Sequence, residues 1–237
     1  MNYSENVNPA IAALLDGVIR NQKTEHINIL EFGCWSGALG KYFLDAYPGL
    51  TWVGIDRDEA ALTVAKTRLS SVYKSDIDSI NLSNIADQVA SSNYIIFADV
   101  LEHLMSPERL LKQIRALSPQ GLIFISLPNI ASYEIFLQLS YGDFQYEEHG
   151  ILDKTHKKFW TPKSFVTWAS TISYGSASEV LYLKNSAGSR LYSHYKNQIP
   201  AEVVIDRVKI LVDTDALLQS ISSYGFALIL RPISKWQ

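Results

Sequence analysis

Five short apolar runs alternate with helix-patterned segments between residues 27 and 128. The runs cover residues 27–32, 50–56, 70–76, 93–99 and 122–128. Between them, apolar residues recur at helical spacing, most clearly over 38–46, 59–69 and 107–117. Strands that alternate with helices in this way predict a parallel sheet with right-handed crossovers. We therefore expect an α/β fold with helices on both faces of the sheet.

The pattern changes after Pro128, where residues 129–160 are aromatic, charged and irregular. The elements expected in this half are helices over 133–139, 162–170 and around 213–223, and strands over 176–185 and 224–233. The rest of residues 186–222 is polar, and we assign no element to it. No linker rich in Gly, Ser or Pro divides the chain. We therefore expect one domain, residues 1–237, with an N-terminal helix over about 8–20, a ligand-binding core over about 27–128 and an insert over about 129–160.

Composition excludes several classes of protein. The chain has 237 residues, of which 47% are hydrophobic, so it can form a sizeable core. Its formal net charge of −3 argues against nucleic acid or an anionic membrane as partner. The single Cys34 excludes an internal disulfide framework and a multi-cysteine zinc site. With no signal-peptide pattern and no membrane-spanning apolar stretch, we expect a cytoplasmic protein.

The first predicted strand leads into a turn that contains two glycines, Glu31-Phe32-Gly33-Cys34-Trp35-Ser36-Gly37. Glycines let a backbone turn sharply and let a ligand approach its amides closely. The helix that follows directs its N-terminal N–H groups toward the same place. The dinucleotide pattern G-x-G-x-x-G is not met, which counts against NAD as ligand.

Acidic residues end the next three strands. Asp56 ends the second strand, where a carboxylate can accept hydrogen bonds from ribose hydroxyls. Asp76 ends the third strand, where a carboxylate can accept from an adenine amino group, and Asp99 ends the fourth. Ligands of open parallel sheets bind beyond these carboxyl ends. Such an acidic rim would repel a pyrophosphate, whereas a cationic sulfonium cofactor would be attracted.

These segments resemble the motifs of class I S-adenosylmethionine-dependent methyltransferases. ILEFGCWSGALGKYF is similar to their glycine-rich first motif, WVGID to the ribose segment, YKSDI to the adenine-side loop and ADVLEHLMSPERLLKQI to the motif after the fourth strand. The resemblance implies a Rossmann-like methyltransferase fold, whose sheet has seven strands and is parallel except for its last strand. It also implies S-adenosylmethionine as cofactor and S-adenosylhomocysteine as product. The residues that it places at the cofactor are Glu31, Gly33, Gly37, Asp56, Asp76, Ile77 and Asp99.

Trp35 departs from this family pattern, because it replaces the middle glycine of the first motif. If that position requires a positive φ, a tryptophan there is strained. We expect either a reshaped turn or an indole that packs against the ligand, and we include Trp35 among the cofactor-binding candidates.

Residues 150–161, GILDKTHKKFWT, are similar to a segment of bacterial methyltransferases that accompany glycosyltransferases in polysaccharide biosynthesis. This resemblance implies O-methylation of a glycan or a small hydroxylated acceptor. A histidine is the natural base for a hydroxyl near neutral pH. His156 and His149 are the candidates, and Asp153 is expected to orient His156. The nearby lysines 154, 157 and 158 suit either a phosphate-bearing acceptor or simply a solvated loop.

Two alternative functions stay open. The chain could be a quinone- or phenol-type small-molecule methyltransferase, or a catalytically silent subunit that binds the cofactor and serves as scaffold for a glycosyltransferase. Some related ubiquinone-type O-methyltransferases bind a divalent metal after the fourth strand, where this chain has Asp99, Glu102 and His103. We favour a helix-capping role for Glu102 and His103 and expect no metal. A homodimer and a glycosyltransferase partner both stay open.

Overall fold

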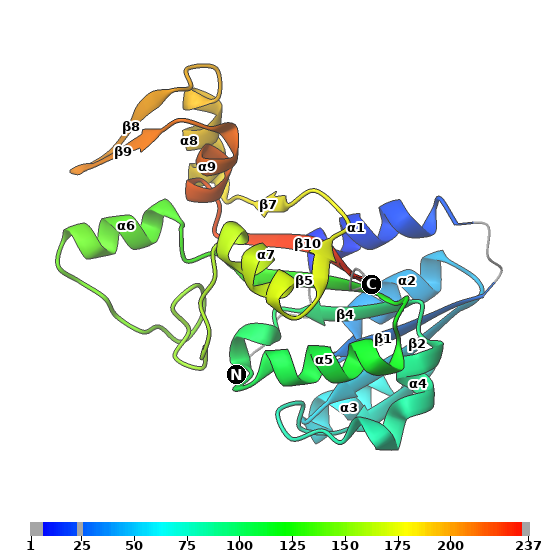
Figure 1. The fold of residues 1–237 in the computed structure, drawn as a ribbon. Helices are drawn as coiled ribbons and strands as arrows, with labels where there is room; N and C mark the ends of the chain where they lie inside the picture. Colours follow the sequence, from blue (N-terminus) through cyan, green and yellow to red (C-terminus); the bar gives the residue numbers. More distant parts are fainter. Residues whose placement is uncertain (1–6, 23–25, 234–237) are drawn as a thin grey trace.

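The computed structural model describes residues 7–22 and 26–233, and a central sheet organises them (Figure 1). The strands are β1 Ile27–Phe32, β2 Leu50–Asp56, β3 Ser71–Lys74, β4 Tyr94–Ala98, β5 Leu122–Pro128, β6 Tyr174–Ser176, β7 Leu181–Leu183, β8 Ala201–Ile205, β9 Val208–Val212 and β10 Gly225–Pro232. The helices are α1 Pro9–Ile19, α2 Ala38–Ala46, α3 Glu59–Ala65, α4 Ala86–Ser91, α5 Pro107–Leu117, α6 Tyr133–Ser140, α7 Pro162–Thr171, α8 Ser186–Tyr195 and α9 Asp215–Ile221. Two short 3-10 helices, η1 Leu82–Ile85 and η2 Leu101–His103, precede α4 and α5.

The sheet has the order β3-β2-β1-β4-β5-β10-β6, and β7 also pairs with β10. Strands β1 to β5 are parallel, whereas β10 is antiparallel to β5, β6 and β7. The predicted α/β fold, with its mostly parallel sheet and antiparallel last strand, is confirmed. Because strand order reverses between β1 and β4, their carboxyl ends flank a topological switch point, where ligands of such sheets bind.

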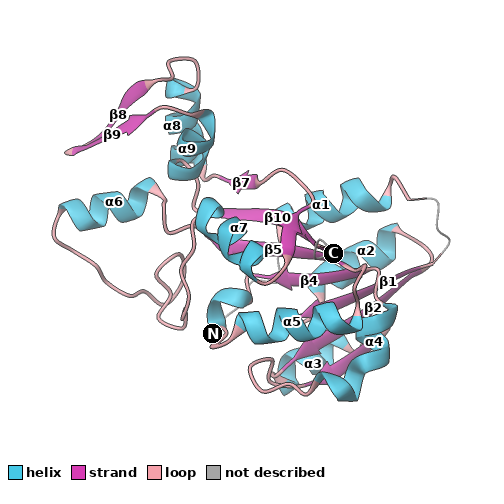
Figure 2. Cartoon of the chain, viewed as in Figure 1, coloured by secondary structure: helices cyan, strands magenta, loops and turns pink. Residues whose placement is uncertain are grey.

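Helices cover both faces of the sheet, as Figure 2 shows. Buried side chains of α1, α2 and α3 pack on one face around Phe43 and Trp52. Those of α4, α5 and α7 pack on the other face around Phe97 and Phe165. The middle strand β4 is buried over Tyr94–Phe97, which explains its continuous apolar run.

The second half of the chain differs from its expected elements. The strand expected over 176–185 is two short strands, β6 and β7, which both pair with β10. Residues 201–212, for which no element is expected, form the antiparallel hairpin β8–β9, and 186–195 form α8. The hairpin, α8 and α9 project beyond β7 in Figure 1 and share a small core of their own, made of Val203, Val212, Leu218 and Ile221. No helix among the described residues is long and apolar enough to cross a bilayer.

Candidate active site

A cavity of about 1330 Å³ lies at the carboxyl ends of the parallel strands. Its walls come from the segments after β1 to β4, from residues 7–9 and from the insert between α6 and α7. The predicted site residues that line it are Glu31, Gly33, Trp35, Asp56, Asp76, Ile77, Asp99, His149, Asp153 and His156. Gly37 does not line it and instead precedes the first residue of α2. The structure thus brings almost all of the sequence-derived candidates to one place.

The turn after β1 has a left-handed backbone at three positions. Gly33 and Gly37 both have φ of +77°, and a Cβ on Gly33 would lie 2.5 Å from Val100 Cγ2. Trp35 has φ of +48°, which is strained for a residue with a Cβ. The tryptophan therefore adopts a conformation that favours glycine, and it borders the cavity.

Asp56 fixes this turn to the end of β2. Its Oδ2 accepts a hydrogen bond from the Trp35 N–H at 2.9 Å, and its Oδ1 accepts from the Asp58 N–H at 2.9 Å. Glu31 lies beneath the turn and is 3% exposed. Its Oε2 accepts from Trp52 Nε1–H at 2.8 Å. Burial, reinforced by the charge of Asp56 and opposed by the Trp52 hydrogen bond, raises the pKa of Glu31 to about 8.

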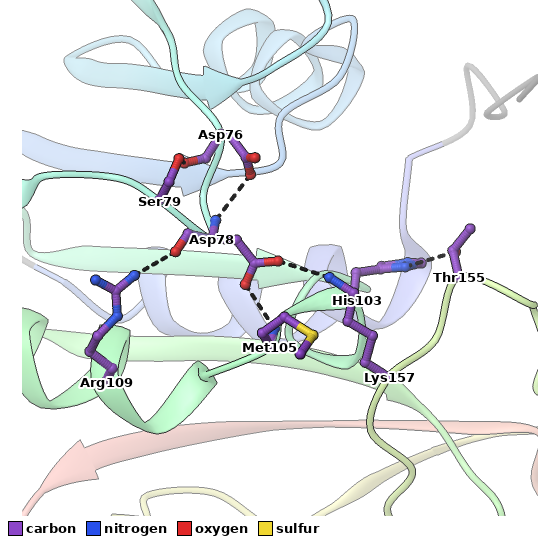
Figure 3. A network of polar contacts seen from close by, with 8 residues as sticks. All are labelled: Asp76, Asp78, Ser79, His103, Met105, Arg109, Thr155 and Lys157. Carbon is purple, nitrogen blue, oxygen red and sulfur yellow. Dashed lines mark hydrogen bonds and ion pairs between the residues drawn. The ribbon is translucent and has the colours of Figure 1, made fainter.

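Asp78 links the loop after β3 to the insert (Figure 3). Its N–H donates to Asp76 Oδ1 at 3.1 Å, and its own Oδ1 accepts from the Met105 N–H at 2.7 Å. Its Oδ2 pairs with Lys157 Nζ at 2.9 Å, and Arg109 donates to its backbone carbonyl. Burial acts to raise the pKa of Asp78, but the Lys157 and Met105 donors outweigh it and hold the pKa below its usual value.

Asp99 ties the N-terminal helix to the end of the sheet. Its Oδ2 accepts from Asn8 Nδ2 at 2.9 Å, and its Oδ1 accepts from Ser126 Oγ at 2.8 Å. Asn8 Oδ1 accepts from the amides of Ala10 and Ile11, so the same side chain also caps α1. Sequence reasoning missed Asn8, although an asparagine before Pro9 is an N-cap signal.

Glu102, His103 and His156 form a compact cluster. One ligand-type atom of each lies within 4.8 Å of the others. Glu102 is 1% exposed, and its Oε2 has no hydrogen-bond partner within the described residues. The amides of Lys157 and Lys158 donate to the Glu102 carbonyl at 2.7 and 3.1 Å, which brings the insert onto η2. Sequence reasoning did not place His156 beside Glu102.

Hydrogen bonds define which nitrogen of each ring carries the proton. His156 Nδ1 lies 3.0 Å from the Ile151 carbonyl, which can only accept, so Nε2 holds the free lone pair. The Thr155 hydroxyl donates to Asp153 Oδ1 at 2.6 Å, so its oxygen accepts from His103 Nδ1 at 3.0 Å. Both imidazoles therefore present Nε2 as an acceptor. The side chain of Asp153 holds Thr155, and the expected contact with the His156 ring is replaced by the Ile151 carbonyl.

Burial controls the charge of this cluster. It raises the pKa of Glu102 well above its usual value, and the charges of Asp99 and Asp153 add to the effect. Burial also lowers the pKa of His103, and the neighbouring His156 lowers it further. For Asp153, burial acts to raise the pKa, but the hydrogen bonds from Thr155 outweigh it and lower the pKa. Burial therefore favours the neutral forms of both Glu102 and His103. His149 is exposed at the rim.

The fold is shared with solved methyltransferases. A SAM-dependent methyltransferase from Archaeoglobus fulgidus is 17% identical, with a TM-score of 0.54 over 96% of this chain and 94% of that one. Magnesium protoporphyrin IX methyltransferase from Synechocystis PCC 6803, solved with S-adenosylhomocysteine (SAH), is 10% identical. Its TM-score is 0.57 over 95% of this chain and 83% of that one. The plantazolicin methyltransferase BpumL, also solved with SAH, is 16% identical, with a TM-score of 0.56 over 94% and 82%.

Sequence comparison identifies the family. No curated protein matches the chain significantly. The sequence profile described as "Methyltransferase domain" matches residues 3–172, which is well over half of the chain. This range includes the turn after β1, the acidic strand ends and the Glu102–His103–His156 cluster. The chain therefore belongs to the methyltransferase-domain family, as its motifs predicted, and is a methyltransferase whose cofactor is S-adenosylmethionine.

Proposed function

We propose that this enzyme methylates a hydroxyl oxygen of a glycan or of another small hydroxylated acceptor. One observation carries the proposal. A single cavity joins the acidic strand ends to two imidazoles that both present Nε2 as a proton acceptor. Hydroxyl methylation needs such a base, because the acceptor oxygen must lose its proton.

The residues at the strand ends suit the cofactor. Gly33 and Glu31 line the cavity, and Asp56 and Asp76 offer carboxylates to a cationic ligand. We propose that Asp56 binds the ribose and that Asp76 and Ile77 contact the adenine. We propose that the indole of Trp35 packs against the cofactor. When bound, the cofactor supplies an electrophilic methyl group on a sulfonium. Since Asn8 and Ser126 hold both oxygens of Asp99, we assign Asp99 a role in shaping the wall, and Gly37 a role in starting α2.

The insert supplies the groups that handle the acceptor. We assign His156 Nε2 as the base that takes the hydroxyl proton, with the Ile151 carbonyl holding the opposite ring nitrogen. Asp153 acts as a positioning residue, because through Thr155 it holds the ring of His103. His149, exposed at the rim, is assigned a contact with the acceptor.

The test is methyl transfer to a panel of sugars, oligosaccharides, catechols and hydroquinones, followed by mass spectrometry of the products and of SAH. We expect O-methylated saccharides. Methylated phenols alone would support the quinone- or phenol-type alternative. SAH binding by calorimetry without turnover on any acceptor would support the silent scaffold. Loss of SAH binding would contradict the proposal altogether.

A divalent metal is a second candidate for activating the hydroxyl. Glu102, His103 and His156 offer three ligand-type atoms within 4.8 Å, and Glu102 Oε2 has no partner within the described residues. Their donor set suits a borderline cation, which would lower the pKa of a bound hydroxyl. Activity that a chelator abolishes and Mn²⁺ or Zn²⁺ restores would favour the metal, whereas activity insensitive to chelator would leave His156 as the base.

We also propose the cellular role and the partner of this enzyme. We propose a cytoplasmic, single-domain enzyme. The resemblance of residues 150–161 supports a role in polysaccharide assembly, with a glycosyltransferase or a second copy as partner. The acidic net charge supports an acceptor other than nucleic acid. Co-purification with and without a glycosyltransferase expressed alongside would test the partner.

A further inference from the structure

The acceptor side of the cavity carries two carboxylates that no cation neutralises. Glu134 lies on α6, and its Oε1 accepts from Asn185 Nδ2 at 2.8 Å. Glu147 lies in the insert, and its Oε1 accepts from Gln138 Nε2 at 3.4 Å. Both partners are neutral amides. Within residues 7–22 and 26–233, neither glutamate forms an ion pair, and both line the cavity.

The two lysines that the insert adds to the cavity wall are already paired. Lys154 Nζ lies 2.6 Å from Glu148 Oε1, and Lys157 Nζ lies 2.9 Å from Asp78 Oδ2. Arg57 follows Asp56, and its charge adds to burial in lowering the pKa of His103. A phosphate that entered beside the insert would therefore have to displace a carboxylate from each lysine. The basic cluster seen in the sequence is thus compensated in the structure.

We propose that the acceptor side of this cavity selects hydroxylated acceptors without phosphate or carboxylate groups, and prefers those that carry an amino group, such as amino sugars. The inference rests on the proposed function and narrows its acceptor class. An ammonium donates charge-assisted hydrogen bonds to carboxylates such as Glu134 and Glu147. An anionic substituent there would meet like charge from the half-buried Glu134 and the exposed Glu147. The cavity defines the site, and the two glutamates define its charge preference.

The experiment compares sugars that differ only in one substituent. Hexoses carrying an amino, hydroxyl, carboxylate or phosphate group at the same carbon are assayed for SAH formation, over several ring configurations. We expect kcat/KM to be highest for the amino sugar and at least about tenfold lower for the anionic sugars. SAH affinity is measured in parallel by calorimetry.

Charge variants test whether the two glutamates cause this ranking. Glu134→Gln and Glu147→Gln keep the side-chain shape and remove the charge, so both are expected to reduce the preference for the amino sugar. Glu148→Gln leaves Lys154 without its carboxylate and is expected to improve the anionic sugars. Glu179→Gln changes the same charge at an exposed position outside the cavity and is the matched control.

Two results would overturn the inference. One is a wild-type enzyme whose kcat/KM for phosphorylated or carboxylated sugars equals that for amino sugars. The other is an unchanged ranking in both Glu134→Gln and Glu147→Gln. Either result, with SAH still bound, leaves the proposed function standing. A protein that does not bind SAH would refute the proposed function and this inference together.

Discussion

The rings of His103 and His156 lie with their centroids 4.8 Å apart and their planes at 63°. His103 lies in η2, the element that follows β4, whereas His156 belongs to the insert. Each ring is held through Nδ1, one by Thr155 and the other by the Ile151 carbonyl. The contact therefore joins the cofactor side of the enzyme to its acceptor side, with both Nε2 atoms left as acceptors.

Replacing His156 separates its role as a base from binding. His156→Ala is expected to lower kcat by about 10²- to 10⁴-fold, because the acceptor hydroxyl loses its proton acceptor. SAH affinity should change little, since the ring lies on the insert. Turnover is measured as SAH formation, and affinity by calorimetry.

Added imidazole distinguishes a base from a structural residue. It should partly restore the activity of His156→Ala, because the deleted ring leaves space for it. His194→Ala removes an exposed histidine of α8 and should behave like wild type. Full activity of the His156→Ala protein would show that His156 is not the base.

Glu31 makes stability depend on pH. Its pKa is about 8 in the folded protein, against an ordinary value of 4.5, because burial disfavours the charged form. The folded state thus holds this proton more tightly than the unfolded chain. The contribution of Glu31 to the free energy of unfolding should be fully present below pH 4.5 and be lost as pH rises to about 8.

Glu31→Gln tests this dependence, because an amide can still accept from Trp52 but cannot ionise. Urea unfolding of cofactor-free protein between pH 5 and 8.5 should show a steeper fall in stability for wild type than for Glu31→Gln. Parallel curves would contradict the shifted pKa.

Asp56 has two separable roles, since it holds the turn through Trp35 and is assigned to the ribose. Asp56→Ala should weaken SAH binding by about 10- to 100-fold if the carboxylate accepts from ribose hydroxyls. An SAH analogue without these hydroxyls should lose much less affinity on the same substitution. Equal losses for the two ligands, measured by calorimetry, would show that Asp56 acts only through the turn.

The sheet could be predicted because its strands are nearly continuous apolar runs. Tyr94–Phe97, for example, is buried throughout, and only a strand covered on both faces accommodates four such residues in succession. The hairpin β8–β9 escaped prediction although each of its strands, AEVVI and VKILV, is apolar at four of five positions. Val203 is buried whereas Val204 faces outward, so these runs do not belong to a strand covered on both faces like β4. Two short apolar runs separated by a turn are themselves a hairpin signal.

The cofactor side could be predicted in the same way, because a parallel sheet gathers its strand ends at one edge. The partners of the catalytic candidates could not. His156 reaches Glu102 only because the amides of Lys157 and Lys158 bond to the Glu102 carbonyl, more than fifty positions earlier in the chain. Local sequence patterns carry no information on such backbone contacts.

Asn8 offers the last prediction, because one side chain caps α1 and also binds Asp99, 91 residues away. Asn8→Asp keeps the cap but replaces the Nδ2 donor by a carboxylate facing Asp99. We expect it to lower the free energy of unfolding by about 1–3 kcal/mol at pH 7. The loss should shrink toward pH 4, because protonation of one carboxyl restores a donor. Asn8→Ser, which also caps helices but cannot reach Asp99 in the same way, should show a smaller loss that does not vary with pH in this manner. Urea unfolding at both pH values measures the difference, and an Asn8→Asp protein as stable as wild type at pH 7 would show that α1 is not held through Asp99.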